Sequence, residues 1–314
     1  MKNRKVLVTG GAGFIGSNLV RRLLEDGNSV TVLDNFMSGY RSNLDPFHAV
    51  RIIEGDIRDK TTVERAMEGA EVVFHFAASV GNKRSIDQPI MDAEINVIGT
   101  LNVLEAARKA GVRKIVASSS AGIFGELKTM PIKEDHPIEP DSPYGCTKLC
   151  EEKLCLSYAK LYKIEAVCLR YFNVYGPNQR FDAYGNVIPI FVFRMLQNES
   201  LLIYGDGEQT RDFVHVDDVV QANIKAANAI GVSGAFNIAS GTRVTINRLV
   251  QMVVKDNKNA VKIEHGSERP GDVRHSLADI ALAHQMIGYS PSVDLENGVK
   301  GYVAWAQKAL IEKK

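Results

Sequence analysis

The sequence predicts an α/β protein whose core is a doubly wound parallel sheet, joined to a smaller, discontinuous C-terminal α/β domain. Up to about Arg170, short runs of β-favouring residues alternate with stretches of helical apolar periodicity. That alternation is typical of repeated β-α-β units with right-handed crossovers. The first unit also contains a turn with three regularly spaced glycines. Beyond Arg170 the alternation weakens, which indicates that a second domain begins there.

The first β-α unit passes from strand to helix through a turn that carries Gly10, Gly13 and Gly16. One glycine permits the tight turn, the second lets the backbone approach a phosphate, and the third lets helix and strand pack closely. The next strand ends in Asp34, an acid about twenty residues past the glycines. An acid there accepts hydrogen bonds from both ribose hydroxyls and repels a 2′-phosphate. The pattern therefore predicts a Rossmann fold that binds NAD rather than NADP.

The other elements of the first domain are apolar runs bounded by turn residues. Strands are expected at 6–9, 29–34, 50–54, 71–78, 114–118 and 164–170, and helices at about 14–24, 61–67, 89–111 and 142–162. The strand at 71–78 is expected to end beside the cofactor, because ligands of open parallel sheets bind at the carboxyl ends of strands. We assign residues 1–172 to this domain, with a return segment at about 214–240.

The C-terminal domain is predicted from weaker patterns. A glycine turn at 205–207 suggests a short pair of strands around 201–204 and 212–215. Helices are expected at 187–196, 216–229, 246–255, 279–287 and 295–311. Residues 173–213 and 241–314 are expected to form the substrate-binding domain.

Composition excludes several classes of protein. The chain has 314 residues and a formal net charge of +1, so no bulk field favours nucleic acid or an anionic membrane. No uncharged apolar stretch approaches the roughly eighteen residues that a membrane-spanning helix needs. Its four cysteines, Cys146, Cys150, Cys155 and Cys168, form no Cys-x-x-Cys pair, and no histidines with ligand-like spacing lie nearby. We expect a soluble cytoplasmic protein without a bound metal.

Candidate catalytic residues follow the strand at 114–118. Ser118, Ser119 and Ser120 stand at its carboxyl end, and Tyr144 and Lys148 lie one helical turn apart on the next helix. A nearby ammonium lowers the pKa of a phenol, which is about 10 in model peptides. Tyr144 is therefore predicted to act as a general base, with Ser120 donating a hydrogen bond to the reacting oxygen. In isolation, such a spacing of Tyr and Lys is more often an ordinary surface pair; after a serine-ended strand of an NAD fold, the catalytic interpretation is favoured.

The chain resembles the extended short-chain dehydrogenase/reductase family of the NAD-dependent epimerase/dehydratase type. Within that family the resemblance is greatest to the UDP-glucose and UDP-N-acetylglucosamine 4-epimerases. The matching segments cover nearly the whole chain in order, and they are Thr9–Gly16, the serine cluster, Tyr144-x-x-x-Lys148, Arg170–Pro177, Gly205–Asp218 and Arg269–Asp272.

The resemblance implies a set of contacts for each ligand. For NAD these are Gly10, Gly13, Phe14, Ile15, Gly16, Asp34, Asn35, Ser38, Gly39, Asp56, Ile57, Phe76, Ala77, Ala78, Asn96, Ser118, Tyr144, Lys148 and Tyr171. For a UDP-sugar they are Ser119, Ser120, Tyr144, Asn173, Val187, Ile188, Tyr204, Arg211, Arg269, Asp272 and Ser276. Ser276 stands where the narrow glucose/galactose epimerases carry a tyrosine, so its small side chain is expected to leave room for an N-acetyl group.

The implied activity is reversible 4-epimerisation of UDP-sugars through a transient 4-keto sugar, with tightly bound NAD. A UDP-uronate 4-epimerase, a decarboxylase and a 4,6-dehydratase remain alternatives. Dehydratases and decarboxylases of the family usually carry an acid after the strand serine, where this chain has Ala121 and Gly122. An idle NAD-binding regulatory protein is the alternative from another class, which intact Ser120, Tyr144 and Lys148 disfavour. Relatives also imply a homodimer formed by the helices at 90–109 and 142–162.

Overall fold

The computed structural model describes residues 1–179, 181, 186–257, 259–268 and 273–311. Its largest sheet has seven strands in the order β11-β6-β5-β4-β1-β2-β3, and every pairing between neighbours is parallel. The strands are β1 (Lys5–Thr9), β2 (Ser29–Asp34), β3 (Arg51–Glu54), β4 (Val72–His75), β5 (Lys114–Ser120), β6 (Glu165–Tyr171) and β11 (Gly234–Ile238). The predicted doubly wound sheet is confirmed.

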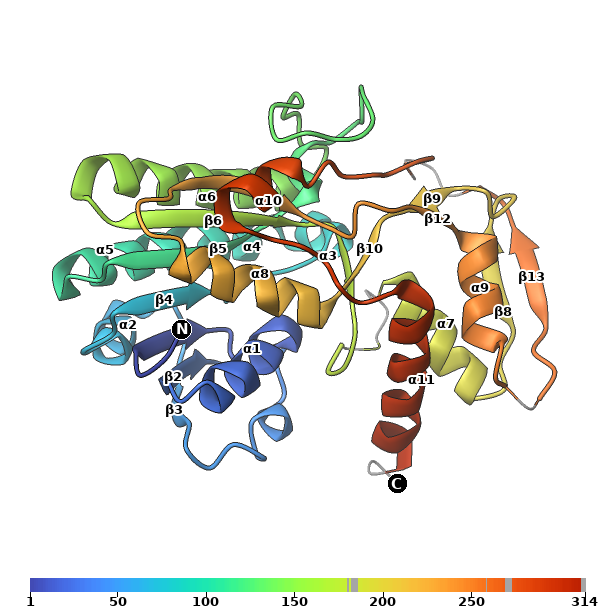
Figure 1. Ribbon diagram of the computed structural model, residues 1–314, viewed down its shortest axis with the longest axis horizontal. Helices are drawn as coiled ribbons and strands as arrows, with labels where there is room; N and C mark the ends of the chain where they lie inside the picture. Colours follow the sequence, from blue (N-terminus) through green and yellow to red (C-terminus); the bar gives the residue numbers. More distant parts are fainter. Residues whose placement is uncertain (180, 182–185, 258, 269–272, 312–314) are drawn as a thin grey trace.

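Helices cover both faces of this sheet (Figure 1). One face packs against α1 (Phe14–Glu25), α8 (Val216–Asn228) and α10 (Ala281–Ile287), and the other against α2 (Lys60–Met67), α5 (Thr100–Ala110) and α6 (Pro143–Tyr162). Along β1, Val6 and Val8 belong to the first core and Leu7 to the second. Side chains of a strand alternate between faces, so a continuous apolar run supplies both cores.

The segment between β4 and β5 differs from the prediction of one long helix. It contains α3 (Asn82–Asp87), which was not predicted, then α4 (Pro89–Ala93) and a π-helical segment, η2 (Glu94–Gly99), before α5. Asn96 lies in the π-helical segment, and its side chain hydrogen-bonds the backbone of Ser79 and the Thr147 hydroxyl. Those contacts come from distant parts of the chain, so the local periodicity does not reveal the widened turn.

The C-terminal part of the chain packs around α7 (Val187–Leu196), α9 (Ile246–Val254) and α11 (Leu295–Ile311). Three two-stranded sheets accompany these helices. They pair β8 (Leu201–Tyr204) with β13 (Ile263–Gly266), β10 (Phe213–His215) with β7 (Asn173–Tyr175), and β9 (Thr210–Arg211) with β12 (Val244–Thr245). The predicted pairing of 201–204 with 212–215 is wrong, because each strand finds its partner elsewhere in the chain.

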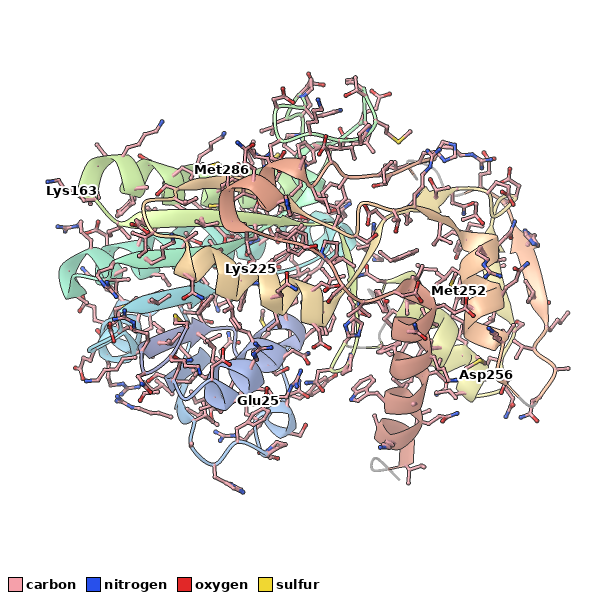
Figure 2. The ribbon with its side chains drawn as sticks, in the orientation of Figure 1. Glu25, Lys163, Lys225, Met252, Asp256 and Met286 are labelled. Carbon is pink, nitrogen blue, oxygen red and sulfur yellow. The ribbon has the colours of Figure 1, made fainter. Side chains whose placement is uncertain are left out.

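The chain re-enters the large sheet after β10. The returning strand β11 pairs with β6 from Gly234 opposite Val167 to Ile238 opposite Tyr171. Lys225 of α8, labelled in Figure 2, donates a hydrogen bond to the Gly288 carbonyl just after α10. This contact links α8 to α10, which packs against the same core of the sheet. Within the described residues, no helix is both long and apolar enough to span a membrane.

Candidate active site

The carboxyl ends of the central strands open into one cleft of about 760 Å³. It lies where the strand order reverses, between β1 and β4, which is where open parallel sheets bind ligands. Residues after β1, β2, β4, β5 and β6 line one side of the cleft, and Arg211, Val273 and Ser276 line the other. A volume of this size suits a large ligand.

The glycine turn leaves no room for side chains. Gly10 has φ +69°, and a Cβ there would lie 2.6 Å from the Ala77 backbone nitrogen. A Cβ on Gly16 would collide with the Gly10 carbonyl oxygen. Helix α1 begins after Gly13 with no side-chain cap and no acidic residue in its first turn. Its uncapped N–H groups and helix dipole fit the pyrophosphate of a dinucleotide.

Asp34 at the end of β2 presents a fixed carboxylate to the cleft. Its Oδ2 atom accepts a hydrogen bond from Ala12 N at 2.9 Å, and Oδ1 accepts one from Phe36 N at 2.8 Å. Burial raises the pKa of this carboxyl, and the two backbone hydrogen bonds oppose that rise. Each oxygen keeps acceptor capacity for a ribose hydroxyl. The residues present thus fit NAD.

Asp56 lies farther along the same side of the cleft. Arg58 donates hydrogen bonds to it and lowers the pKa of this carboxyl to about 2, and Asn35 Nδ2 donates another at 2.8 Å. Asp56 is therefore a permanently ionised acceptor at neutral pH. Apart from Asn96, the remaining predicted NAD contacts also line the cleft, among them Phe14, Ile15, Ser38, Gly39, Ile57, Phe76, Ala77, Ala78, Ser118 and Tyr171.

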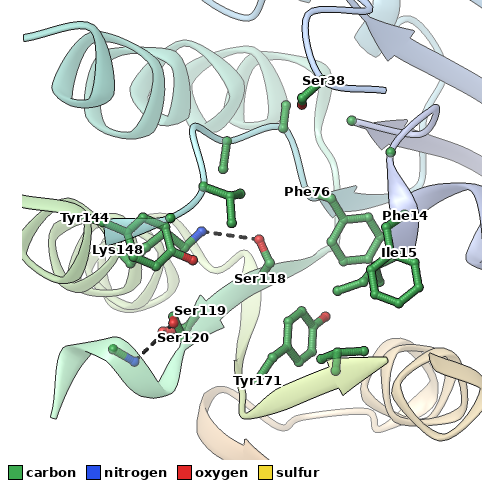
Figure 3. Close-up of a pocket in the computed structure, with 18 of the residues that line it drawn as sticks. Phe14, Ile15, Ser38, Phe76, Ser118, Ser119, Ser120, Tyr144, Lys148 and Tyr171 are labelled. Atoms are coloured by element: carbon green, nitrogen blue, oxygen red, sulfur yellow. Dashed lines mark hydrogen bonds between the residues drawn. The ribbon is translucent and has the colours of Figure 1, made fainter. Parts of the chain in front are cut away.

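The predicted catalytic side chains converge in the cleft (Figure 3). Ser142 caps α6, its Oγ accepting a hydrogen bond from Gly145 N at 3.1 Å, which fixes the first helical turn beside β5. Lys148 Nζ lies 3.2 Å from Ser118 Oγ. Ser120 Oγ accepts a hydrogen bond from Gly122 N at 3.1 Å, which leaves the serine proton to donate toward the phenol of Tyr144.

The structure changes the electrostatic account of Tyr144. Burial raises the pKa of this phenol above its ordinary value, and Lys148 and Ser120 lower it by a smaller amount. The predicted direction of the Lys148 effect is right, but the sequence did not show how thoroughly the phenol is removed from water. Deprotonating Tyr144 at neutral pH therefore depends on every nearby charge.

Asn96 was predicted to contact NAD, but it is not one of the described residues that line the cleft. It is fully buried beneath α6, where its Oδ1 atom accepts a hydrogen bond from Ser79 N at 2.8 Å. Its Nδ2 atom donates to Thr147 Oγ1 at 3.1 Å. Asn96 thus links the loop after β4 to the helix that carries Tyr144 and Lys148.

The predicted sugar-nucleotide residues divide into three groups. Ser119, Asn173, Arg211 and Ser276 line the cleft. Val187, Ile188 and Tyr204 are described by the structure but do not line the cleft. Ile188 is buried in the C-terminal core, and Tyr204 is 40% exposed. Arg269 and Asp272 lie outside the described residues.

The cleft also contains residues that sequence reasoning did not single out. Arg84 enters from the unpredicted α3, and Asn178 and Gln179 come from the polar loop after β7. Glu151, which does not line the cleft, stands one turn after Lys148 and forms an ion pair with it. The sequence signal for this pair is a Lys and a Glu three residues apart on a helix, but that spacing is also common on solvent-exposed helix faces.

A doubly wound NAD-type sheet with a serine, a tyrosine and a lysine at the ends of its central strands defines a short-chain dehydrogenase/reductase. The chain belongs to the NAD dependent epimerase/dehydratase family, whose model matches residues 6–239. The predicted family and cofactor are confirmed.

Named relatives span nearly the whole chain. A "Putative UDP-glucose 4-epimerase" of Methanocaldococcus jannaschii is 41% identical over 96% of this chain and 97% of its own length. The structure of a UDP-N-acetylglucosamine 4-epimerase from Methanobrevibacter ruminantium, in complex with UDP-N-acetylmuramic acid, has a TM-score of 0.94 and 38% identity, covering 98% of this chain and 100% of that one. A UDP-glucose 4-epimerase from Thermotoga maritima with UDP-glucose has a TM-score of 0.91 and 40% identity, covering 98% and 99%.

Proposed function

We propose that the protein is a UDP-hexose 4-epimerase that interconverts UDP-glucose and UDP-galactose, and also UDP-N-acetylglucosamine and UDP-N-acetylgalactosamine. The observation that carries the proposal is the convergence of Ser120, Tyr144 and Lys148 in the cleft beside a strand end without carboxylates. Relatives named as 4-epimerases of both kinds of sugar support it.

The proposed chemistry assigns a proton task to each residue. Bound NAD supplies a hydride acceptor and donor for C4 of the sugar. Tyr144, as phenolate, takes the proton from the C4 hydroxyl and returns it after the sugar has presented its other face. Ser120 donates a hydrogen bond to the C4 oxygen, and Lys148 stabilises the phenolate electrostatically. The reaction has no net redox change.

Alternative reactions start from the same oxidation but need further groups. A 4,6-dehydratase must remove a proton and water, and its relatives place carboxylates directly after the strand serine. Here Ala121 and Gly122 stand there and line the cleft. A UDP-uronate 4-epimerase or a decarboxylase would act on a sugar carboxylate, and an idle NAD-binding protein would not need the serine, tyrosine and lysine together.

Acceptance of N-acetylated sugars is argued from Ser276. This residue lines the cleft, and its backbone nitrogen donates a hydrogen bond to Thr210 O at 3.1 Å, which fixes it beside Arg211. A serine leaves out the volume of a phenol ring. Its hydroxyl can bond an acetamide directly or through water.

One assay tests the proposal against its alternatives. The purified protein is analysed for bound NAD and then mixed separately with UDP-glucose, UDP-N-acetylglucosamine and UDP-glucuronate, without added cofactor. Equilibrium mixtures of 4-epimers from the first two sugars support the proposal. Loss of water or of CO2, turnover of the uronate alone, or no conversion at all would each replace it with the corresponding alternative.

We also propose that the enzyme is a cytoplasmic homodimer. The two helical segments expected to pair carry exposed apolar side chains, among them Ile90, Ile98, Leu161 and Tyr162. An apolar surface of this kind suits burial against a second copy. Four free cysteine thiols agree with a reducing compartment. Light scattering should give twice the chain mass at micromolar concentration; the mass of one chain would contradict the dimer.

A further inference from the structure

A buried carboxylate stands beside Lys148, and the chemistry proposed above does not use it. Glu151 Oε2 lies 2.5 Å from Lys148 Nζ, and both side chains are 2% exposed. The other carboxylate oxygen, Oε1, has no hydrogen-bond partner within the described residues. Burying a charge costs free energy unless its hydrogen bonds are made, so stability alone does not explain this residue.

The adjacent residue on α6 provides the contrast. Glu152 is equally buried, but Arg170 donates hydrogen bonds to both of its oxygens, at 2.9 and 2.8 Å, and Ser119 Oγ donates another at 2.8 Å. Glu152 is therefore a satisfied structural ion pair. Glu151 instead faces the lysine that stands next to the reacting phenol.

The ion pair lies within a cluster of titratable groups. Glu152, Cys155 and Asp92 act on Glu151, Lys148 or Tyr144, and Lys148 or Glu151 in turn acts on His75 of β4 and on Cys168 and Tyr171 of β6. Burial lowers the pKa of His75 to about 3, so it stays neutral. Glu151 is the carboxylate in direct contact with the Lys148 ammonium.

We propose that Glu151 is a positioning residue for the epimerase reaction proposed above: its carboxylate fixes the Lys148 ammonium beside Tyr144 and offsets part of the cation's field at the phenol. The two roles oppose each other, because the contact that orders Lys148 also weakens the effect of its charge on the Tyr144 phenol. The protonation state of Glu151 therefore determines how strongly Lys148 acts on that phenol.

Burial raises the pKa of Glu151 to about 7, although Lys148 pulls it down. When Glu151 is ionised, its charge raises the pKa of Tyr144; when it is protonated, Lys148 acts on the phenol unopposed. Burial works to lower the pKa of Lys148, but Glu151, Tyr144 and Cys155 together hold that pKa above its usual value. Removing the charge of Glu151 should therefore lower the pKa of both Tyr144 and Lys148.

Glu151→Gln and Glu151→Asp separate charge from shape. Gln keeps the length and an acceptor oxygen for Lys148, whereas Asp keeps the charge. Activity requires Tyr144 to be deprotonated and Lys148 to be protonated. The acid limb of the pH profile therefore reports the pKa of Tyr144, and the basic limb reports the pKa of Lys148. With the NAD-loaded protein, we expect Glu151→Gln to move both limbs of kcat/KM to lower pH, each by about one unit. Glu151→Asp should keep both limbs near their wild-type positions.

Ultraviolet titration of tyrosinate gives a second readout that needs no turnover. Subtracting the Tyr144→Phe spectrum isolates this phenol from the other nine of the ten tyrosines. Its midpoint should fall in the Glu151→Gln background, and this result stands even if the protein epimerises no UDP-sugar. The proposal would be overturned if Glu151→Gln left both the tyrosinate midpoint and the pH limbs unchanged. It would also be overturned if Glu151→Asp shifted the limbs as far as Glu151→Gln does. Glu152→Gln is the matched control: it is expected to lower the melting temperature and to move the limbs by less than Glu151→Gln does, because Glu152 pairs with Arg170 and acts on Lys148 only through Glu151.

Discussion

The two sides of the cleft hold their residues in different ways. On the sheet side, Gly10, Asp34 and Ser118 lie at the ends of strands that are hydrogen-bonded to a neighbour on both sides. On the other side, Arg211 belongs to a two-residue strand, and Ser276 follows a single bridge between Thr210 and His275. Backbone geometry therefore fixes the residues on the sheet side, whereas side-chain size on the other side can determine which ligands fit. Changes on the sheet side should abolish function, and changes on the other side should alter substrate preference.

The largest effect is expected at Tyr144, which lines the cleft from the first turn of α6. Tyr144→Phe removes the group that exchanges the C4 proton and keeps the ring, so turnover should fall by roughly 10²–10⁴-fold. Binding of UDP-glucose, measured by calorimetry, should stay close to wild type. A variant with wild-type turnover would sink the assignment of Tyr144 as the base.

The buried ion pair on the sheet side should matter almost as much, through stability. Arg170→Leu leaves the Glu152 carboxylate buried without its cation, and such changes lower the free energy of unfolding by about 3–5 kcal/mol. Arg274→Ala on the other side breaks an exposed pair with Asp206 and should change the denaturation midpoint very little. Equal midpoint shifts for the two variants in urea would erase the contrast.

The glycine turn provides a smaller but specific test. In Gly16→Ala the new methyl group meets the Gly10 carbonyl, so the loop must move away from the phosphate position and NAD retention should fall about tenfold or more. The matched control is Gly301→Ala on α11, where a Cβ meets nothing within 4 Å. The control should keep its NAD and melt at the same or a slightly higher temperature. Undiminished NAD in purified Gly16→Ala would contradict the steric account.

The smallest effect is expected at Ser276, because only one class of sugar is affected. Ser276→Tyr adds a ring to the cleft and should reduce kcat/KM for the N-acetylated sugars about tenfold or more, while changing the plain hexoses only a few-fold. Ser276→Ala, which adds no volume but removes the hydroxyl, should keep the activity on plain hexoses and lower that on N-acetylated sugars only a few-fold. If the wild-type protein fails to convert the N-acetylated pair, the interpretation of Ser276 is wrong.

The same contrast explains which features could be predicted from the sequence. The glycine turn and Asp34 are encoded within about thirty residues of one β-α-β unit, so the fold class, family and cofactor were predictable. The partner of β8 lies some sixty residues further on, at β13, and no local pattern reveals it. The π-helical turn at Asn96 depends on Thr147, and the raised pKa of Tyr144 depends on burial by several elements. Features that depend on contacts between distant parts of the chain could be seen only in the structure.

The position of β11 has a consequence for synthesis on the ribosome. The large sheet closes only when residues 234–238 pair with β6, and the chain makes β7 through β10 before it reaches them. A nascent chain that stops short of β11 exposes the seven-residue β6 as an open edge, which is a site for aggregation. No translation stop therefore yields the complete seven-stranded sheet without also including β7 to β10.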